Sequence, residues 1–407
     1  MTMGPSPEHP PLPARGSDAA PEAPGTTTTE ESRTDLPGDV PQRVLVWRRF
    51  RRNRPAVAGA LVLCVLVLVS IFSEFLAPGT PGAYNADRTY APPQRLHFVD
   101  TSDGFDLGMY VYDYEVERDP ETLANTYTVD ESAKIPVGLF VRGRPYEMWG
   151  LFPGDLHLIG AKDPDQDVYL LGADRNGRDM ASRIVYGTRV SMSIGLAGVA
   201  LSFVLGLVLG GLSGYLGGRV DNGIQRVIEF LMSIPTIPLW MGLSAAVPRD
   251  WGAIQTYLAI TVILSLIGWT DLARVVRGRF LSLRQEDFVT AARLDGCGTG
   301  RVIGRHMLPS FTSHIIASLT LAVPFMILAE TSLSFLGLGL QAPVVSWGVL
   351  LQEAQNIHSI ANAPWLLLPG AAVTVAVLVL NFVGDGVRDA ADPYSQGGGR
   401  LGDRNPR

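Results

Sequence analysis

Six stretches of the sequence are long, apolar and almost free of charged side chains, and they constrain the fold more than any other feature. They are residues 56–73, 190–218, 230–248, 251–270, 310–329 and 363–384. Each has about the 18 to 20 residues that a helix needs to cross a hydrocarbon core roughly 30 Å thick. Uncharged runs of this length are rare in water-soluble proteins. The sequence therefore predicts an all-α polytopic membrane protein with six transmembrane helices.

The distribution of charge predicts which side of the membrane each loop faces. Residues 46–55 (VWRRFRRNRP) place five arginines directly before the first span, and the positive-inside rule puts such an end in the cytoplasm. Counting spans from there puts residues 78–189 outside and residues 271–309 inside. Residues 84–182 carry 18 Asp or Glu against 9 Lys or Arg, whereas residues 271–309 carry seven arginines. Both termini should therefore be cytoplasmic.

The regions outside the spans differ in composition. The N-terminal region is rich in Pro, Thr and Ala, so it cannot bury enough apolar area to offset its ordering entropy, and we expect a disordered tail. The acidic region after the first span contains runs of strand-like composition between Gly, Pro and Asp, which predict a small β-rich extracytoplasmic insert rather than a disordered loop. These runs are residues 109–116, 125–129, 135–143, 155–160 and 167–171.

The predicted organisation therefore has five parts. They are a disordered cytoplasmic tail (1–43), a basic segment with the first transmembrane helix (44–77), the extracytoplasmic insert (78–182), a core with five transmembrane helices and a loop at 273–309 (183–393), and a second cytoplasmic tail (394–407).

The loop contains the sequence DFVTAARLDGCGTGRVIGRHMLPS, residues 287–310, which is hydrophilic although it lies between two spans. Each arginine at a bilayer centre costs about 2.5–3.5 kcal/mol, so the seven of this loop exclude it from the membrane. One helix face collects residues at three- and four-residue spacing, namely Phe288, Ala291, Ala292 and Asp295. Gly296 is placed to end this helix. Thr299 can cap a second helix, which must stop before Pro309. The pattern indicates a docking surface and leaves an ordinary amphipathic linker open.

The same loop resembles the signature of ABC importer permeases, which runs Glu-Ala-Ala, three residues, Gly, nine residues and Ile-x-Leu-Pro. Here Ala291 and Ala292 are followed by Gly296 and, after nine intervening residues, by the run His306 to Pro309. Thr290 stands where the family has Glu, and His306 where it has Ile. Further segments resemble the dipeptide/oligopeptide/nickel branch, and some resemble its members with a long insert after the first span: residues 48–59, 141–160, 171–193, 234–240, 332–348 and 364–393.

The resemblance implies the type I ABC importer permease fold and a coupling helix that sits in a cleft of a cytoplasmic ATPase. The residues that it assigns to this contact are Phe288, Thr290, Ala291, Ala292, Arg293, Gly296, Arg301, Arg305, His306, Leu308 and Pro309. The implied partners are a second homologous permease, two ABC ATPase subunits and an extracytoplasmic solute-binding protein, in the inner (plasma) membrane of a bacterium. The implied solutes are peptides or oligosaccharides.

Other classes of protein fit the sequence less well. The chain has no GxxxxGK[ST] phosphate loop, so we expect no enzyme activity and ATP hydrolysis in a separate subunit. Cys64 and Cys297 are too few for a disulfide framework, and we expect no metal, cofactor or nucleic acid. The main alternative is an ion-coupled secondary transporter, which would need carboxylates near mid-membrane. Glu229 and Glu330 instead fall near the ends of predicted spans.

Two patterns inside the spans concern helix packing. Gly206, Gly210 and Gly214 repeat every four residues, a small-residue face that lets membrane helices approach closely. Pro235 and Pro238 should kink the third span, either as a hinge or as a static bend.

Overall fold

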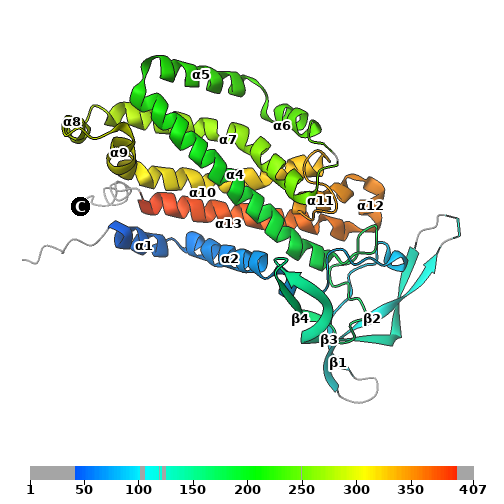
Figure 1. The fold of residues 1–407 in the computed structure, drawn as a ribbon. Coiled ribbons are helices and arrows are strands. Elements are labelled where there is room, and N and C mark those ends of the chain that lie inside the picture. Colours follow the sequence, from blue (N-terminus) through cyan, green and yellow to red (C-terminus); the bar gives the residue numbers. More distant parts are fainter. Residues whose placement is uncertain (1–41, 101–105, 119, 122–124, 249, 392–407) are drawn as a thin grey trace, which may run out of the picture. The chain divides into compact units, whose positions relative to one another are not determined.

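A computed structural model describes residues 42–391, apart from residues 101–105, 119, 122–124 and 249. The predicted tails, 1–43 and 394–407, therefore lie outside the described residues, except that Gln42 and Arg43 begin the first helix. Figure 1 shows long helices side by side in a bundle, with the β-strands beyond one end of it.

In chain order the described helices are α1 (Gln42–Arg52), α2 (Arg54–Ile71), α3 (Ser73–Leu76), α4 (Met180–Leu216), α5 (Gly218–Ser233), α6 (Thr236–Ala245), α7 (Ala253–Leu283), α8 (Asp287–Leu294), α9 (Thr299–Arg301), α10 (Thr312–Phe335), α11 (Trp347–Gln352), α12 (Ile357–Asn362) and α13 (Leu368–Ala391). Short 3-10 helices lie at η1 (Ala86–Arg88), η3 (Leu308–Phe311), η4 (Glu353–Gln355) and η5 (Pro364–Leu367), and a π-helix at η2 (Val302–Met307).

Within the described residues, five helices are long and apolar enough to cross a membrane, namely α2, α4, α7, α10 and α13. Each covers one predicted span. The helices α4, with 37 residues, and α7, with 31, continue well beyond the predicted limits. The helices thus coincide largely with the predicted apolar stretches, and two of them are longer than predicted.

The predicted third span, residues 230–248, is not one helix. The helices α5 and α6 meet at a bend of 89°, and the pair amounts to a sixth span only if it is counted as one broken span. The break lies at Ile234, which has an extended backbone (φ −94°, ψ 130°) directly before Pro235. A proline disfavours helical geometry in the residue before it, so the predicted kink is in fact a full interruption.

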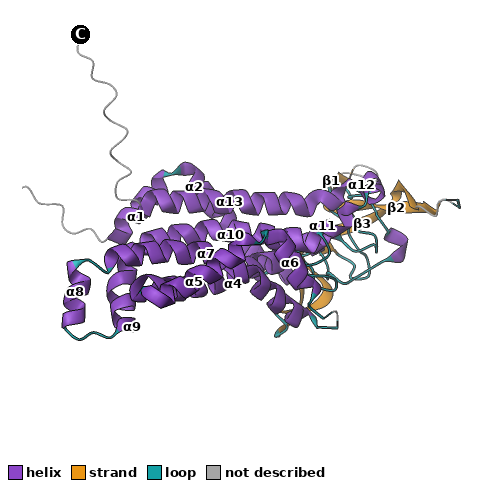
Figure 2. Cartoon of the chain, turned by 90° about the horizontal axis from the view of Figure 1, so that it is seen from above, coloured by secondary structure: helices purple, strands orange, loops and turns teal. Residues whose placement is uncertain are grey.

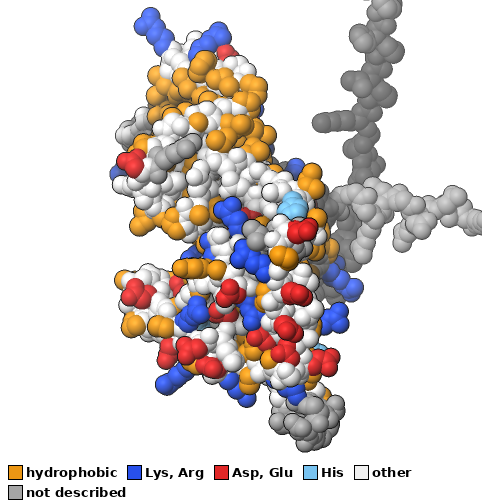
Figure 3. All heavy atoms as spheres, turned by 90° about the vertical axis from the view of Figure 1, so that its right-hand side faces the viewer, with side chains coloured by type: hydrophobic (Ala, Val, Ile, Leu, Met, Phe, Trp, Pro, Cys, Tyr) orange, Lys and Arg blue, Asp and Glu red, His pale blue; other side chains and the backbone are white. Residues whose placement is uncertain are grey.

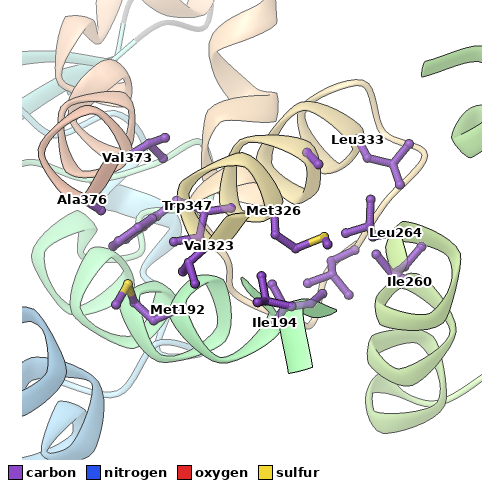
Figure 4. Close-up of a cluster of buried hydrophobic side chains, with 14 of the residues drawn as sticks. Met192, Ile194, Ile260, Leu264, Val323, Met326, Leu333, Trp347, Val373 and Ala376 are labelled. Atoms are coloured by element: carbon purple, nitrogen blue, oxygen red, sulfur yellow. The ribbon is translucent and has the colours of Figure 1, made fainter. Parts of the chain in front are cut away.

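The largest buried cluster holds α4, α7, α10, α11 and α13 together. Figure 4 shows side chains of this cluster in the space between the helices, with Trp347, which is fully buried, on the side of Val373 and Ala376. The cluster includes Met192, Ile194, Ile260, Leu264, Val323, Met326, Leu333, Val373 and Ala376. Apolar side chains therefore fill the space between the helices, and tight packing of this kind is what associates helices in a membrane.

The helices α4 and α7 approach each other at the predicted glycine face. A Cβ atom added at Gly210 would lie 2.5 Å from the carbonyl oxygen of Ala273, and one at Gly214 would lie 2.7 Å from that of Arg277. A Cβ at Gly206 would lie 3.0 Å from the carbonyl oxygen of Trp269. The absence of side chains at these positions lets the two backbones come this close.

The strands form one antiparallel sheet of order β1-β2-β3-β4. Their bounds are β1 (His97–Asp100), β2 (Asp106–Arg118), β3 (Asn125–Met148) and β4 (Phe152–Ala161). The runs predicted at 125–129 and 135–143 are parts of the single strand β3, and β1 was not predicted. Seen from this end of the molecule, Asp, Glu, Lys and Arg side chains are spread over the lower part, whereas the upper part, on the side of α6, is largely apolar (Figure 3).

The strand predicted at residues 167–171 is wrong. Val168 and Tyr169 are buried, and Val168 packs into the small core beneath the sheet. The backbone of Tyr169 pairs with Gln94 instead of a strand: its N–H donates to the Gln94 side chain at 2.7 Å, and its carbonyl accepts from the Gln94 N–H at 2.9 Å. The apolar composition of this run therefore reflects burial in a loop.

An ion pair between two helices also binds the β3–β4 turn. Arg189 of α4 pairs with Glu74 of α3, and the Trp149 N–H of the β3–β4 turn donates to the same carboxylate at 3.1 Å. Burial alone would raise the pKa of Glu74, but the hydrogen bonds from Arg189 and Trp149 hold this pKa below its ordinary value of 4.5. The contacts from Arg189 and Trp149 thus hold the Glu74 carboxylate in its charged form.

Candidate functional site

The candidate site is the segment between α7 and α10. The helix α8 covers the predicted first helix, and Gly296 follows it with φ +74°, a left-handed conformation that glycine adopts without strain. The predicted second helix differs from the structure. Its cap is Gly298 and not Thr299, and the chain runs on through α9, η2 and η3 into α10.

Pro309 does not end the helical path as predicted. It occupies the first turn of η3. A proline is tolerated there because the N–H groups of a first turn have no partner within the helix. The segment therefore consists of one separate helix, α8, and a continuous helical approach to α10.

The face of α8 turned toward the rest of the chain is formed by Val289 and Ala292. Val289 is fully buried and Ala292 is 5% exposed, and both belong to a cluster with Val276, Phe280, Val302, Met307, Phe311 and Ile315. The methyl group of Ala292 is thus enclosed within this chain. The two adjacent alanines thus lie on different faces.

The outward face of α8 carries Phe288, Ala291 and Leu294. Phe288 is 41% exposed and Leu294 is 83% exposed, and Ala291 between them is also exposed. Sequence reasoning missed Leu294, although it lies three residues after Ala291 and so continues the same face. We call these three residues the outward face of α8.

The arginines assigned to this site have different surroundings. Arg293 lies over the ring of Tyr215, 4.7 Å from its centroid, and its Nε donates to the Tyr215 hydroxyl at 3.2 Å. A cation held over an aromatic ring in this way fixes α8 to the end of α4. Arg301 and Arg305 are exposed. The basic charge of the segment is therefore partly fixed within the chain and partly presented to its surroundings.

The remaining assigned residues border this face. Thr290, Gly296 and Pro309 are exposed, and His306 and Leu308 are half-buried. The Thr290 hydroxyl donates to the Glu286 carbonyl at 3.3 Å, so it closes the first turn of α8. The hydroxyl of Thr290 is thus turned back onto its own helix, at the position where the family pattern has an acidic side chain.

An ion pair fixes the base of the segment. Arg277 of α7 donates to both oxygens of Asp221 of α5, at 2.5 and 2.7 Å, and the Ser213 hydroxyl of α4 donates to the same carboxylate at 2.5 Å. Arg277, expected in a loop, is therefore part of α7. The bidentate geometry orients three helices at the end from which α8 projects.

Glu330 is a further polar centre that the sequence did not predict. It is fully buried within the chain. Hydroxyls of Ser334 and Ser346 donate to its Oε1 at 2.8 Å, and that of Ser191 donates to its Oε2 at 3.4 Å. Because these serines come from α4, α10 and the N-cap of α11, the carboxylate joins three elements through hydrogen bonds.

The two ends of the bundle carry different secondary-structure elements. Figure 2 shows α8 and α9 at one end and the strands at the other. The exposed arginines of the candidate segment are thus separated from the acidic sheet region by the length of the long helices. This arrangement agrees with the charge asymmetry of the sequence.

Known families match this chain over two ranges. Residues 206–394 match the family model described as binding-protein-dependent transport system inner membrane component. Residues 42–93 match the N-terminal TM domain of oligopeptide transport permease C.

Curated relatives extend the match over most of the chain. The dipeptide transport system permease protein DppC of Bacillus subtilis is 36% identical over 349 residues, which is 85% of this chain and 84% of the relative. The protein of the same name from Lactococcus lactis is 30% identical over 85% of this chain and 89% of its own length. The oligopeptide transport system permease protein OppC of Escherichia coli is 40% identical over 56% of this chain and 74% of its own length.

A solved structure, an inward-facing conformation of the MetNI methionine ABC transporter, has a TM-score of 0.42 and 17% identity and covers 52% of this chain and 98% of its own. The sequence matches alone are sufficient for the assignment, because they span both family models and most of the chain. This chain belongs to the dipeptide and oligopeptide branch of the ABC importer permeases, the membrane components of binding-protein-dependent transport systems.

Proposed function

We propose that this chain forms half of the translocation pathway of an ATP-driven peptide importer and that the outward face of α8 receives the force of ATP hydrolysis. The relatives named above are dipeptide and oligopeptide permeases, which favours peptides over oligosaccharides as the solute. The other subunits would be a second, homologous permease, two ABC ATPases and a solute-binding protein. The type I fold with six spans, counting α5 and α6 as one, belongs to this proposal.

The observation that carries the proposal is the geometry of α8. Its inward face is anchored by Val289 and Ala292, so the helix moves together with the ends of α7 and α10. Its outward face presents two apolar side chains, Phe288 and Leu294, to a partner. A helix that is fixed on one face and apolar on the other fits helix-in-groove recognition. A force on α8 would thus reach the spans directly.

The proposed orientation follows from the two ends of the bundle. The α8 end carries exposed arginines, and the N-terminal helix α1 adds Arg48, Arg49, Arg51 and Arg52. The positive-inside rule places such an end in the cytoplasm, where the ATPases are. The sheet would then lie outside, on the side of the solute-binding protein, with both termini inside.

The two neighbouring alanines provide the test. In a chain with Cys64 and Cys297 replaced by serine, Ala291→Cys and Ala292→Cys are each labelled with a maleimide, with and without the ATPase subunits. We expect Ala291→Cys to react readily and to be protected by the ATPases. Ala292→Cys should react slowly in both conditions, because it is enclosed in this chain. Equal labelling of Ala291→Cys with and without the ATPases would refute the proposed contact.

The energy source is tested separately, in proteoliposomes that hold the complete complex. Uptake of a labelled peptide should require ATP in the compartment that α8 faces. It should continue when ionophores collapse the ion gradients. The alternative, an ion-coupled secondary transporter, predicts the reverse result. In this design, a failure of the α8 contact and a failure of ATP dependence are distinct outcomes.

A further inference from the structure

The turn between β3 and β4 carries exposed apolar side chains. Trp149, Leu151 and Phe152 are 55%, 72% and 63% exposed, and we call them the hairpin tip. The surrounding run, residues 148–154 (MWGLFPG), contains no charged residue, although residues 84–182 contain 18 acidic and 9 basic ones. Exposed apolar groups in an otherwise highly charged region indicate a surface that meets something other than water.

Hydrogen bonds fix the hairpin tip at the end of α2. The indole N–H of Trp149 donates to the carbonyl of Ile71, the last residue of α2, at 2.9 Å. The helix α2 has 18 residues, which corresponds to about 27 Å of helix and so to the thickness of a hydrocarbon core. Since Arg54 begins this helix, Ile71 lies at the opposite boundary of the apolar layer. The hairpin tip is therefore level with the membrane interface.

The tip also continues an apolar surface of α2. This helix exposes Leu61, Val65, Leu68 and Phe72, which are 70%, 52%, 46% and 41% exposed. Their spacing of four, three and four residues places them in one stripe along the helix. The stripe ends at Phe72, the residue that follows the carbonyl to which Trp149 is bonded. The hairpin tip is thus bonded at the end of the helix that carries this stripe.

A second aromatic contact supports the same placement. The ring of Phe140, in β3, lies 6.1 Å from that of Phe75 in α3, and Phe140 is 61% exposed. Both Phe140 and Trp149 have positive φ angles, of 54° and 58°. Bulky residues rarely adopt this left-handed conformation, so the backbone is held in a costly shape that presents these rings at the end of α2.

We propose that the hairpin tip inserts into the lipid leaflet at the Ile71 end of α2, with Trp149 at the headgroup level and Leu151 and Phe152 among the upper acyl chains. Tryptophan is enriched at this depth because its ring is apolar and its N–H is polar. The charged side chains beside the tip, such as Arg142 and Asp155, would remain in the headgroup region or in water. The β-sheet is thereby held to the membrane by lipid contact in addition to its contacts with α2 and α3.

Lipid accounts for this surface better than a protein partner does. A stable protein interface buries about 800 Å² on each side and has a polar rim matched to its partner. The hairpin tip consists of three side chains that merge with a lipid-facing helix. The inference concerns the leaflet at one end of α2 and is independent of which side of the cell that leaflet faces and of the role of α8.

The test uses site-directed fluorescence in the full-length chain reconstituted in phosphatidylcholine nanodiscs. With Cys64 and Cys297 replaced by serine, Leu151→Cys and Phe152→Cys each receive an environment-sensitive fluorophore. The matched control is Val129→Cys, which is 56% exposed near the start of β3. We expect blue-shifted emission and quenching by doxyl-labelled phosphatidylcholine at both tip positions, and quenching by aqueous iodide at residue 129.

Two results would overturn the inference. One is quenching of both tip positions by iodide as strong as that at residue 129, which would place the tip in water. The other is protection of the tip from iodide and doxyl lipid alike, which would place it against protein. Two tip positions are used so that a local disturbance by one substitution does not decide the result.

Discussion

The outward face of α8 and the hairpin tip are both exposed and apolar, yet their surroundings differ. Phe288 and Leu294 lie on a segment with exposed arginines, on a helix that the chain anchors from one side only. The hairpin tip lies in an uncharged run and continues the lipid-facing stripe of α2. The comparison teaches that an apolar patch indicates its partner through what surrounds it: charge at its rim favours a protein, and continuity with a membrane helix favours lipid.

The largest expected effect comes from truncating the outward face of α8. The double substitution Phe288→Ala and Leu294→Ala should weaken binding of the ATPase subunits at least about tenfold, because burial of each side chain is worth roughly 1.5–3 kcal/mol. Affinity is measured by titrating purified ATPase onto the immobilised permease. The matched control is Leu151→Ala with Phe152→Ala, which removes two apolar side chains at the other end. If both pairs weaken binding equally, the two patches do not have separate roles.

The second prediction concerns the anchored face of α8. Val289→Asp places a carboxylate in a fully buried position and should destabilise the attachment of α8 by about 3 kcal/mol. Cys297, half-buried beside this cluster, provides a native probe, and its reaction with a maleimide should become faster. Thr290→Asp, one residue later and exposed, should leave the rate unchanged. An unchanged rate in Val289→Asp would show that α8 is not held by this cluster.

The third prediction concerns the helix contact that connects the two ends. Gly210→Ala places a Cβ atom 2.5 Å from the Ala273 carbonyl oxygen, so α4 and α7 must separate. The expected cost is about 1–3 kcal/mol, seen as a lower midpoint of thermal unfolding in nanodiscs. Gly223→Ala in α5, where nothing lies within 4 Å of the added atom, is the control and should be neutral or stabilising. Equal midpoints for the two variants would mean that α4 and α7 can separate at Gly210 without loss of stability.

The smallest effect is expected from the ion pair at the sheet end. The pKa of Glu74 is lowered in the folded protein, so its contribution to stability is fully present above the ordinary value of 4.5 and is lost as the pH falls through the lower native value. Wild-type protein should thus lose more thermal stability than Glu74→Gln as the pH falls below 4.5. Parallel pH profiles of the two proteins would exclude a role for this carboxylate in fixing the sheet.

The sequence predicted the positions of the spans well, since the thickness of a bilayer fixes the length of an apolar helix. It predicted their ends poorly. Arg274 and Arg277 mark the end of the apolar stretch, but α7 continues through both, and Arg277 is held by Asp221. At Ile234 the predicted helix was too long instead of too short. One apolar stretch contained a break, and only the backbone preference of the residue before Pro235 indicates it.

For the candidate site, the sequence identified the helix but not its two faces. Ala291 and Ala292 are the same residue type, and which of them is enclosed depends on Val276, Phe280 and other residues that are distant in sequence. Leu294 was not selected because, in a chain with so many apolar residues, a single leucine does not stand out as part of an exposed face. The hydrogen bonds of Glu330 could not be predicted because its serine partners come from three separate segments.

The length of α4 has a mechanical consequence. Its 37 residues make an unbroken rod about 55 Å long, from Met180 near the sheet to Leu216 next to Tyr215, on which Arg293 rests. A tilt of about 5° about one end displaces the other by about 5 Å, without breaking any hydrogen bond inside the rod. A small tilt of α4 about its Tyr215 end would therefore shift its other end, near Arg189 and the sheet, by a distance comparable to the width of a peptide strand.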